Sequence, residues 1–292
     1  MKGTQKSGVS SLYYGRMRID AHQHFWDIGR FQYPWMPPGE SPLRRNFLPP
    51  QLETILKRNR FDGSVVVQAN SIIEETHWLL DLASQYEFIR GVVGWVDLTD
   101  ARLGSTLDEI QQHSKFKGVR HLVHDEPDIN WLLREDVLRG LNELARRGIA
   151  YDLLLRPEHL NLVPRIAERV PDLRMVIDHI AKPPIAALRM DAWAEDMEAA
   201  AKIPQLYCKL SGMITEDDPR GWKAEHLRPY VRHVLALFGP DRLMFGSDWP
   251  VCLLAGTWKE VLAAFTQAIG PQPLEAREKM LGETAARFYG LD

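Results

Sequence analysis

Short apolar runs alternate along the chain with longer segments in which apolar residues recur at helical spacing. The run Val65-Val66-Val67 is β-branched and apolar on both faces, which is typical of a buried parallel strand. Between residues 51 and 59, Leu52, Ile55 and Leu56 share one face of a predicted helix. The alternation continues through the sequence and predicts a series of strands, each followed by a helix.

The predicted strands cover residues 18–24, 64–68, 89–98, 116–123, 150–155, 174–180, 205–211 and 242–247. The predicted helices cover residues 51–59, 74–86, 107–113, 130–147, 159–170, 191–201, 228–238, 257–268 and 274–289. This order, without a break in composition, predicts an α/β fold, namely one (β/α)8 TIM barrel over residues 17–292 as a single domain. A doubly wound open sheet is the alternative, but no Gly-X-Gly-X-X-Gly or P-loop follows any predicted strand.

Two segments depart from the alternation. Residues 1–16 are polar and rich in Ser and Gly, and we expect a disordered leader or a cloning remnant ahead of a start at Met17. Residues 25–50 are rich in proline and aromatic residues, which forbids a regular helix there. A loop of this length in a compact domain usually has a function, so we expect a lid or a pocket wall.

Composition narrows the class of protein. Among 292 residues the net charge is −3, and no dense Lys/Arg cluster suggests a nucleic-acid partner. The two cysteines, Cys208 and Cys252, cannot build a disulfide framework and sit in apolar runs, so we expect core residues in a reduced, cytoplasmic setting. No stretch approaches the roughly 18 apolar residues of a membrane span. The oligomeric state stays open.

The stretch Asp20-Ala21-His22-Gln23-His24 follows a short extended run. Alternate side chains of a strand point the same way, so His22 and His24 are expected to project together. Neutral imidazole offers a ring nitrogen, and the pair therefore suits a divalent metal or a proton-transfer site. Two surface or core histidines are the alternative for an isolated His-X-His.

Candidate chemical residues fall repeatedly at the carboxyl ends of the predicted strands, where such barrels hold their active sites. Burying each of these groups alone and unpaired would cost several kcal/mol, so their placement predicts a shared polar pocket. They are His22 and His24 on strand one, Gln68 on strand two, Arg120 and His124 on strand four, His179 on strand six and Asp248 on strand eight.

Each of these residues has a structural alternative. Asp248 could cap the following helix, and His179 could be a core histidine satisfied by a carbonyl. Arg120 could be a structural ion-pair partner, and Lys182 could be a solvated loop lysine. His124 stays open between a structural and a binding role.

The aromatic residues at strand ends allow two interpretations. Trp26, Trp95 and Trp249 could pack in the core, or could offer their faces to the apolar faces of sugar rings. His121 is expected to be structural. Lys209, in the seventh strand, needs a partner if it points into the barrel, and the sequence assigns none.

Five motifs, in order along the chain, resemble the amidohydrolase superfamily and, more narrowly, its sugar-lactone hydrolases. That branch acts on L-fuconolactone or L-rhamnonolactone and includes the related pyrone-dicarboxylate lactonase. The motifs run from about Met17 to the C-terminus. They are Asp20-Ala21-His22-Gln23-His24-Phe25-Trp26, Gly118-Val119-Arg120, Asp178-His179-Ile180-Ala181-Lys182-Pro183, Lys209-Leu210-Ser211-Gly212 and Phe245-Gly246-Ser247-Asp248-Trp249-Pro250.

The resemblance implies a distorted barrel and a metal-binding motif at His22 and His24, completed by His179 and Asp248. Two features depart from the superfamily pattern. The fifth strand, 151–155, has no histidine ligand, and the fourth strand has its lysine too early to be a carboxylated ligand. The resemblance therefore implies no binuclear site, but at most one divalent metal, with zinc as the candidate, and a reaction that can dispense with it.

The function implied by the resemblance is hydrolysis of a sugar aldonolactone to its aldonic acid. Asp248 would be the general base that activates water, and His22, His24 or a Zn²⁺ that they hold would polarise the carbonyl. His179 would donate a hydrogen bond to the developing oxyanion, hold the metal or take part in proton transfer. The remaining residues would bind substrate: Arg120, Lys182, Gln68, His124, Trp26, Trp95 and Trp249. The alternatives are a metal-dependent decarboxylase or hydratase, and a non-catalytic carbohydrate-binding barrel.

Overall fold

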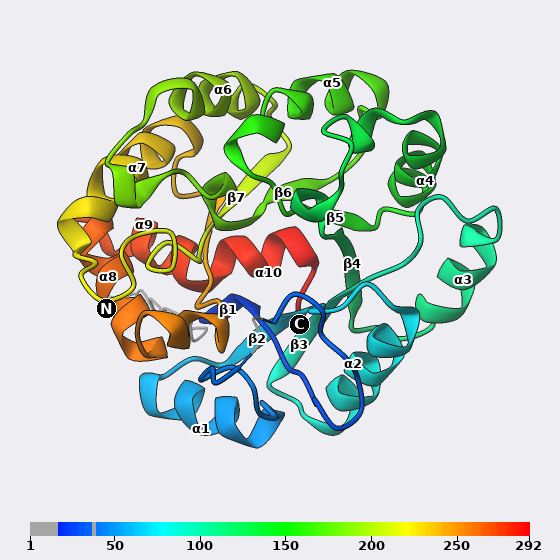
Figure 1. Cartoon of the computed structure of the whole chain (residues 1–292), viewed down its shortest axis with the longest axis horizontal. Coiled ribbons are helices and arrows are strands. Elements are labelled where there is room, and N and C mark those ends of the chain that lie inside the picture. The colour runs from blue at the N-terminus through cyan, green and yellow to red at the C-terminus, as the bar shows by residue number, and fades with distance from the viewer. Residues whose placement is uncertain (1–16, 37–38) are drawn as a thin grey trace, which may run out of the picture.

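A computed structural model describes residues 17–36 and 39–292, and the leader expected at residues 1–16 lies outside this range. The described chain forms one sheet of eight parallel strands in sequence order, surrounded by helices (Figure 1). The strands are β1 (Ile19–Gln23), β2 (Gly63–Val67), β3 (Ile89–Gly94), β4 (Phe116–His121), β5 (Ala150–Leu153), β6 (Met175–Ile177), β7 (Leu206–Leu210) and β8 (Leu243–Phe245). The predicted (β/α)8 barrel is confirmed, and the open-sheet alternative is wrong.

The helices also follow the predicted order. They are α1 (Pro49–Asn59), α2 (Ile73–Gln85), α3 (Leu103–Ile110), α4 (Glu135–Arg146), α5 (Leu162–Arg169), α6 (Asp191–Ala201), α7 (Ala224–Phe238), α8 (Trp258–Ile269), α9 (Leu274–Glu278) and α10 (Thr284–Tyr289). Within the described ranges, no helix is both long enough and apolar enough to cross a bilayer.

The barrel closes between its first and last strands through the backbone just beyond them. The N–H of His24 donates to the carbonyl of Trp249 at 2.7 Å, and the N–H of Asp248 donates to the carbonyl of His22 at 2.8 Å. The pairing of β1 with β2 also shifts register between Asp20 and Gln23. The seam of the barrel therefore lies where the sequence predicts its chemistry.

One end of the barrel interior is filled by small and β-branched side chains and by α10. Figure 1 shows α10 crossing the centre of the ring of strands. Alternate positions of the strands face inward, and these residues pack with one face of α10. The buried cluster contains Ile19, Ala21, Val65, Val67, Val93, Ala150, Val176, Met244, Ala285, Phe288 and Tyr289.

The single helix predicted over 274–289 is wrong, because a π-helical turn at Lys279–Glu283 separates α9 from α10. Gly282 in this turn lies directly against the start of the barrel. A β-carbon on Gly282 would lie 2.0 Å from the carbonyl oxygen of Met17 and 2.7 Å from the Cα of Arg18. The chain bends here because only glycine permits this approach of two backbones.

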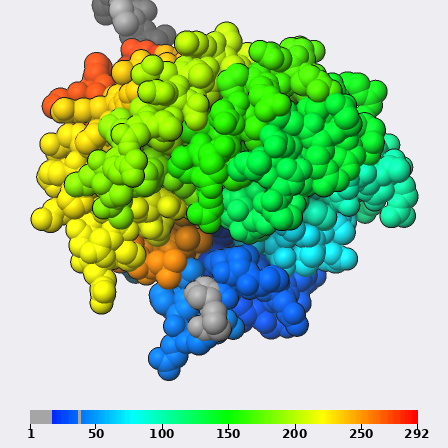
Figure 2. All heavy atoms as spheres, turned by 45° about the horizontal axis from the view of Figure 1, so that its top comes forward, coloured from blue at the N-terminus to red at the C-terminus, as the bar shows by residue number. Residues whose placement is uncertain are grey.

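The proline-rich segment 25–50 folds back on itself at the carboxyl end of the barrel. A short antiparallel bridge joins Trp26 to Phe47 at its base. In Figure 2 this blue segment meets the orange and green parts of the chain around a hollow in the surface. The segment therefore borders the face where the strands end.

We expect Gly282→Ala to destabilise the protein by about 1–3 kcal/mol or more, because its methyl group would overlap the backbone at Met17. Thermal unfolding measures the effect. Gly104→Ala is the matched control, since a β-carbon there comes no closer than 3.7 Å to another atom, and alanine favours helix α3. Equal melting temperatures for Gly282→Ala and wild type would contradict the close approach.

Candidate active site

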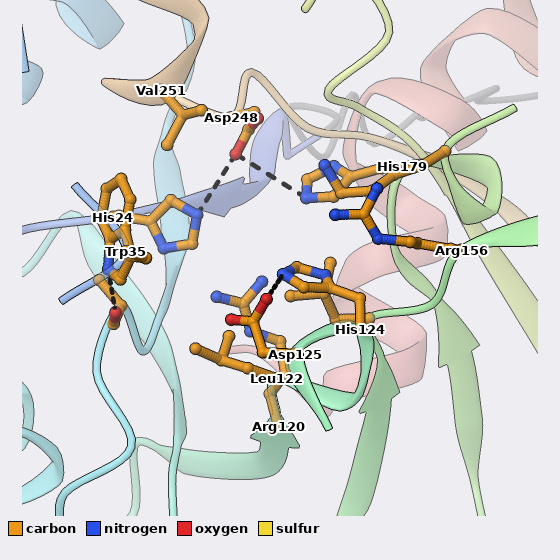
Figure 3. Close-up of a pocket in the computed structure, with 13 residues that line it drawn as sticks. His24, Trp35, Arg120, Leu122, His124, Asp125, Arg156, His179, Asp248 and Val251 are labelled. Carbon is orange, nitrogen blue, oxygen red and sulfur yellow. Dashed lines mark hydrogen bonds and ion pairs between the residues drawn. The ribbon is translucent and has the colours of Figure 1, made fainter. Parts of the chain in front are cut away.

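A cavity of about 320 Å³ opens at the carboxyl ends of the strands. Its wall combines polar and apolar side chains and comes from the ends of six of the eight strands and the loops that follow them, with Trp35 from the proline-rich segment. The lining residues are His24, Trp35, Ala69, Arg120, Leu122, His124, Asp125, Leu154, Arg156, His179, Lys182, Asp248 and Val251. Figure 3 shows Asp248 between His24 and His179 at one side of the cavity.

The two early histidines and the late carboxylate meet in this cavity. The Nε2 atoms of His22 and His24 lie 3.2 Å apart. The Oδ1 atom of Asp248 lies 3.3 Å from Nε2 of His24, 3.8 Å from Nε2 of His22 and 3.9 Å from Nε2 of His179. His24 and Asp248 border the cavity, whereas His22 is fully buried behind them.

The loop after β8 holds Asp248 in place through Asp20, whose carboxylate is completely buried. This carboxylate accepts the backbone N–H of Ser247 and the indole N–H of Trp258, both at 2.8 Å. Burial raises the pKa of Asp20 to about 6. Asp248 has a φ of 57°, in the left-handed region that Asp tolerates better than most residues.

The proton positions on His24 indicate how the cluster can bind a cation. Its Nδ1 atom lies 2.8 Å from the carbonyl oxygen of Val67, which can only accept, so Nδ1 carries the proton. The Nε2 atom of His24 therefore presents a lone pair towards the acceptor Oδ1 of Asp248. Two facing acceptors favour a cation or a proton between them.

Within residues 17–36 and 39–292, two groups of three side chains bring possible ligand atoms within 4.8 Å of one another: His22 with His24 and Asp248, and His22 with Asp178 and His179. Two imidazoles and a carboxylate are suitable ligands for a divalent ion with open coordination positions. The donor set of the first group therefore fits one divalent metal. Because both groups share His22, they describe alternative positions around one centre.

His179 follows β6 in a left-handed stretch of backbone, with a φ of 54°. Its Nδ1 atom lies 2.8 Å from the hydroxyl oxygen of Ser211. Gly212 packs so closely on the ring that a β-carbon there would lie 2.5 Å from Nδ1. The loop after β7 thus fixes the orientation of His179, with Nε2 directed towards Asp248.

The ionisation states follow from burial and from neighbouring charges. Burial holds the pKa values of His22 and His179 well below the ordinary value, so both are neutral at neutral pH. Burial opposes ionisation of Asp248, but His179, His24 and Lys182 outweigh it and lower the pKa of this carboxyl below its ordinary value. An ionised carboxylate therefore faces the neutral imidazole of His179.

Arg120 lines the cavity and also forms the buried ion pair that the sequence offered as its structural alternative. Its Nη1 atom lies 3.2 Å from Oδ2 of Asp178 and 3.3 Å from Nε2 of His22. Its Nη2 atom donates to the carbonyl oxygen of Gln68. Gln68 is fully buried outside the cavity lining, and its amide donates to the carbonyl oxygen of Arg120 at 3.2 Å. Gln68 therefore positions Arg120, and its role in substrate binding stays a prediction.

Lys209 has the partners that the sequence could not assign. Its Nζ atom lies 2.5 Å from Oδ2 of Asp152, 3.0 Å from Oδ1 of Asp178 and 3.1 Å from Nδ1 of His22. Tyr289 donates its phenolic O–H to Asp152 at 2.8 Å. A buried polar column thus runs from the α10 end of the barrel to His22. The sequence analysis missed Asp152 and Tyr289, since their strand and helix patterns do not distinguish them from core positions.

The three tryptophans proposed for sugar binding lie outside the cavity lining. Trp26 is fully buried and donates its indole N–H to the carbonyl oxygen of Arg45 at 2.9 Å. Trp249 packs edge-on against Phe47, and Trp95 donates its indole N–H to His121 at 3.0 Å. These three indoles are held by the fold, which favours the core-packing alternative.

Trp35 supplies the aromatic wall instead. Its indole N–H donates to the carbonyl oxygen of Ala69 at 2.7 Å, and its ring packs at 76° against Trp26. The loop that carries Ala69 is in turn fixed by Glu75, whose carboxylate accepts the N–H groups of Ala69 and Asn70 at 2.8 Å each. The sequence marked this segment as a pocket wall but did not single out Trp35.

Charged groups complete the cavity. Lys182 pairs with Glu216 at 2.7 Å, and His124 lies 3.3 Å from Asp125. Arg156 also lines the cavity, and Figure 3 labels it among the lining side chains. Arg156 was missed because it follows the predicted end of the fifth strand and belongs to none of the motifs.

An eight-stranded barrel with a His/Asp/Arg centre at the carboxyl ends of its strands has the architecture of a (β/α)8-barrel enzyme. The family model described as amidohydrolase matches residues 19–291. The chain belongs to the amidohydrolase family.

Named relatives of this chain include two lactonases. It is 39% identical over 282 residues to an L-fucono-1,5-lactonase of Burkholderia ambifaria, covering 94% of this chain and 96% of that protein. It is 37% identical to an L-fucono-1,5-lactonase of Burkholderia multivorans, covering 95% and 97%. A crystal structure of an amidohydrolase from Burkholderia multivorans with bound zinc matches with a TM-score of 0.88 at 36% identity, covering 94% of this chain and all of that one.

We expect His24→Asn to weaken binding of Zn²⁺ by at least about tenfold, because it removes a lone pair from the candidate metal centre. Competition against a chromophoric chelator measures the affinity. His233→Asn is the control, because His233 lies on helix α7 outside the cavity lining. Unchanged affinity in His24→Asn would exclude His24 as a ligand.

Proposed function

We propose that this chain hydrolyses a sugar aldonolactone of the L-fuconolactone type to the open aldonic acid. The observation that carries the proposal is the ionised Asp248 carboxylate, held against His24 and His179 inside a cavity of suitable size for one sugar ring. The lactonase relatives, aligned over nearly the whole chain, support the same substrate class.

Asp248 is the proposed general base. It takes a proton from a water molecule, which attacks the carbonyl carbon of the lactone. The tetrahedral intermediate then collapses, the bond from carbon to the ring oxygen breaks, and the protonated Asp248 returns its proton to the departing oxygen. One water is consumed, and a hydroxy acid is released. The low pKa of Asp248 keeps it ionised and ready for the next turnover.

The oxyanion needs positive charge or hydrogen-bond donors at the carbonyl oxygen. Arg120 and Lys182 line the cavity as cations, and His179 presents its Nε2 atom there. His22, His24 and Asp248 are the residues that would hold a divalent ion, and such an ion would polarise the carbonyl when bound. We propose zinc as this ion, supported by the zinc in the related crystal structure.

Substrate selection is proposed for lining residues other than Asp248. The ring of Trp35 would cover the apolar C–H face of the sugar, while Arg156 and His124 would bind its hydroxyls. The two free, buried cysteines, Cys208 and Cys252, support a reduced setting, and we propose the cytoplasm.

We expect Asp248→Asn to lower the turnover of L-fucono-1,5-lactone by about 10²–10⁴-fold, because an amide cannot take the proton of water. A pH-indicator assay with and without chelator measures hydrolysis, and circular dichroism checks the fold. Asp125→Asn is the matched control: Asp125 also lines the cavity, but its side chain is half exposed and lies 3.3 Å from His124. Wild-type rates in Asp248→Asn would remove this residue from the mechanism.

We expect Trp35→Leu to raise KM about tenfold with a smaller change in kcat, because the sugar loses its aromatic wall but keeps the reacting groups. Trp35→Phe should lie between, since it keeps a ring and loses the hydrogen bond to Ala69. Steady-state kinetics across a panel of aldonolactones measures both parameters. A fall in kcat alone would contradict this role.

A further inference from the structure

We propose that Arg120 is a built-in competitor of the divalent metal for Nε2 of His22, so that the protein holds the metal weakly and can polarise the lactone carbonyl without it. The inference rests on the proposed function only for the identity of the carbonyl. The competition between Arg120 and the metal depends only on the contacts of Arg120 with His22 and Asp178.

The side chain of Arg120 is held in place by burial and by its hydrogen bonds. Its side chain is 4% exposed, and its guanidinium spans Oδ2 of Asp178 and the carbonyl oxygen of Gln68. Gln68 also holds the backbone of Arg120 through the bond from its amide to the Arg120 carbonyl oxygen. The guanidinium therefore cannot leave without taking from Asp178 one of its two buried cations, the other being Lys209, which makes its position part of the fold.

The fixed guanidinium points at a metal-ligand atom. Its Nη1 atom lies 3.3 Å from Nε2 of His22, the nitrogen that faces His24 and Asp248. A metal bound to this nitrogen at about 2.0–2.1 Å would need the same lone pair and would lie close to a full positive charge. Metal binding at His22 therefore costs the Arg120 contact and adds repulsion between two cations.

The other ring nitrogen of His22 adds to this effect. Nδ1 lies 3.1 Å from the Lys209 ammonium and 3.3 Å from Oδ1 of Asp178. When Lys209 donates to Nδ1, the ring proton stays on Nε2, where a metal cannot bind. When Nδ1 carries the proton towards Asp178, Nε2 is free for Arg120. In the first arrangement a proton occupies Nε2 of His22, and in the second the Arg120 guanidinium contacts its lone pair.

The consequence is that the candidate metal site already contains a positive charge, the guanidinium of Arg120. Arg120 lines the cavity, and its guanidinium can face the carbonyl oxygen with the metal absent. The metal ligands fit a divalent ion, but the ion must displace a contact that the fold maintains. The structure thus assigns weak metal binding to a named side chain.

The test is the Zn²⁺ affinity of the metal-free enzyme, titrated against a chromophoric chelator at constant pH. Arg120→Met removes the charge and the donor, and it should bind Zn²⁺ about ten- to a hundredfold more tightly than wild type. Arg156→Met is the matched control. It removes the same charge from the same cavity, but no contact with His22 is described for it, so its affinity should stay within about threefold of wild type.

Arg120→Met leaves Asp178 with one cation fewer, so circular dichroism and thermal unfolding must show a folded protein. If it does not fold, Arg120→Gln replaces it, because its amide keeps a donor for Asp178 without the charge. Equal or weaker Zn²⁺ affinity in the folded variant, or an equal gain in Arg156→Met, would overturn the proposal.

A second readout separates this proposal from the proposed function. Without metal, Arg120→Met should hydrolyse L-fucono-1,5-lactone about 10²-fold more slowly than wild type, and added Zn²⁺ should restore part of the rate. If the wild type hydrolyses no lactone, the proposed function fails while the Zn²⁺ affinities still decide the competition.

Discussion

The pairing of buried charges in the centre of the barrel is the constraint on which the site depends. Asp152, Asp178 and Lys209 are completely shielded from water, and Arg120 nearly so. Charges in such a place are tolerated only when each has a partner, and removing one partner of a buried pair typically costs about 3–5 kcal/mol. The pairing therefore fixes where every one of these side chains must lie.

This network of buried charges holds His22 in position. His22 in turn lies against His24 and Asp248 at the cavity. The Lys209 ammonium lies at one ring nitrogen and the Arg120 guanidinium at the other. Because burial keeps the imidazole neutral, its two nitrogens differ, and the neighbouring cations bear on which one carries the proton. The interior of the barrel thereby influences the proton positions in the cavity, although the residues that do so contact no substrate.

The sequence predicts the barrel well because its signals are local. Runs such as Val65-Val66-Val67 are typical of buried strands, and the order of strands and helices then predicts the topology. The meeting of His22, His24, His179 and Asp248 follows from the rule that active sites lie at the carboxyl ends of strands. The break at Gly282 could not be predicted, because it depends on the Met17 backbone, which is distant in sequence.

The sequence predicts less well which side chains of the site point into the cavity. Trp26, Trp95, Trp249 and Gln68 all stand at strand ends, yet each is held by hydrogen bonds or ring contacts outside the cavity, and the sequence carries no signal of these partners. Trp35 and Arg156 line the cavity from loops, where neither periodicity nor a motif marks direction. For Lys209, the sequence indicated only that a lysine pointing into the barrel needs a partner. Its acceptors, Asp152 and Asp178, come from two other strands.

Helix α10 follows all eight strands in the chain, yet it fills one end of their interior and brings Tyr289 to Asp152. During synthesis on the ribosome, every strand therefore emerges before the helix that covers their common core. Until α10 docks, Asp152 and Lys209 can still be hydrated from that end, and the network around His22 lacks its last donor. Completion of the catalytic end of the barrel thus depends on a segment at its opposite end that follows all eight strands in the chain.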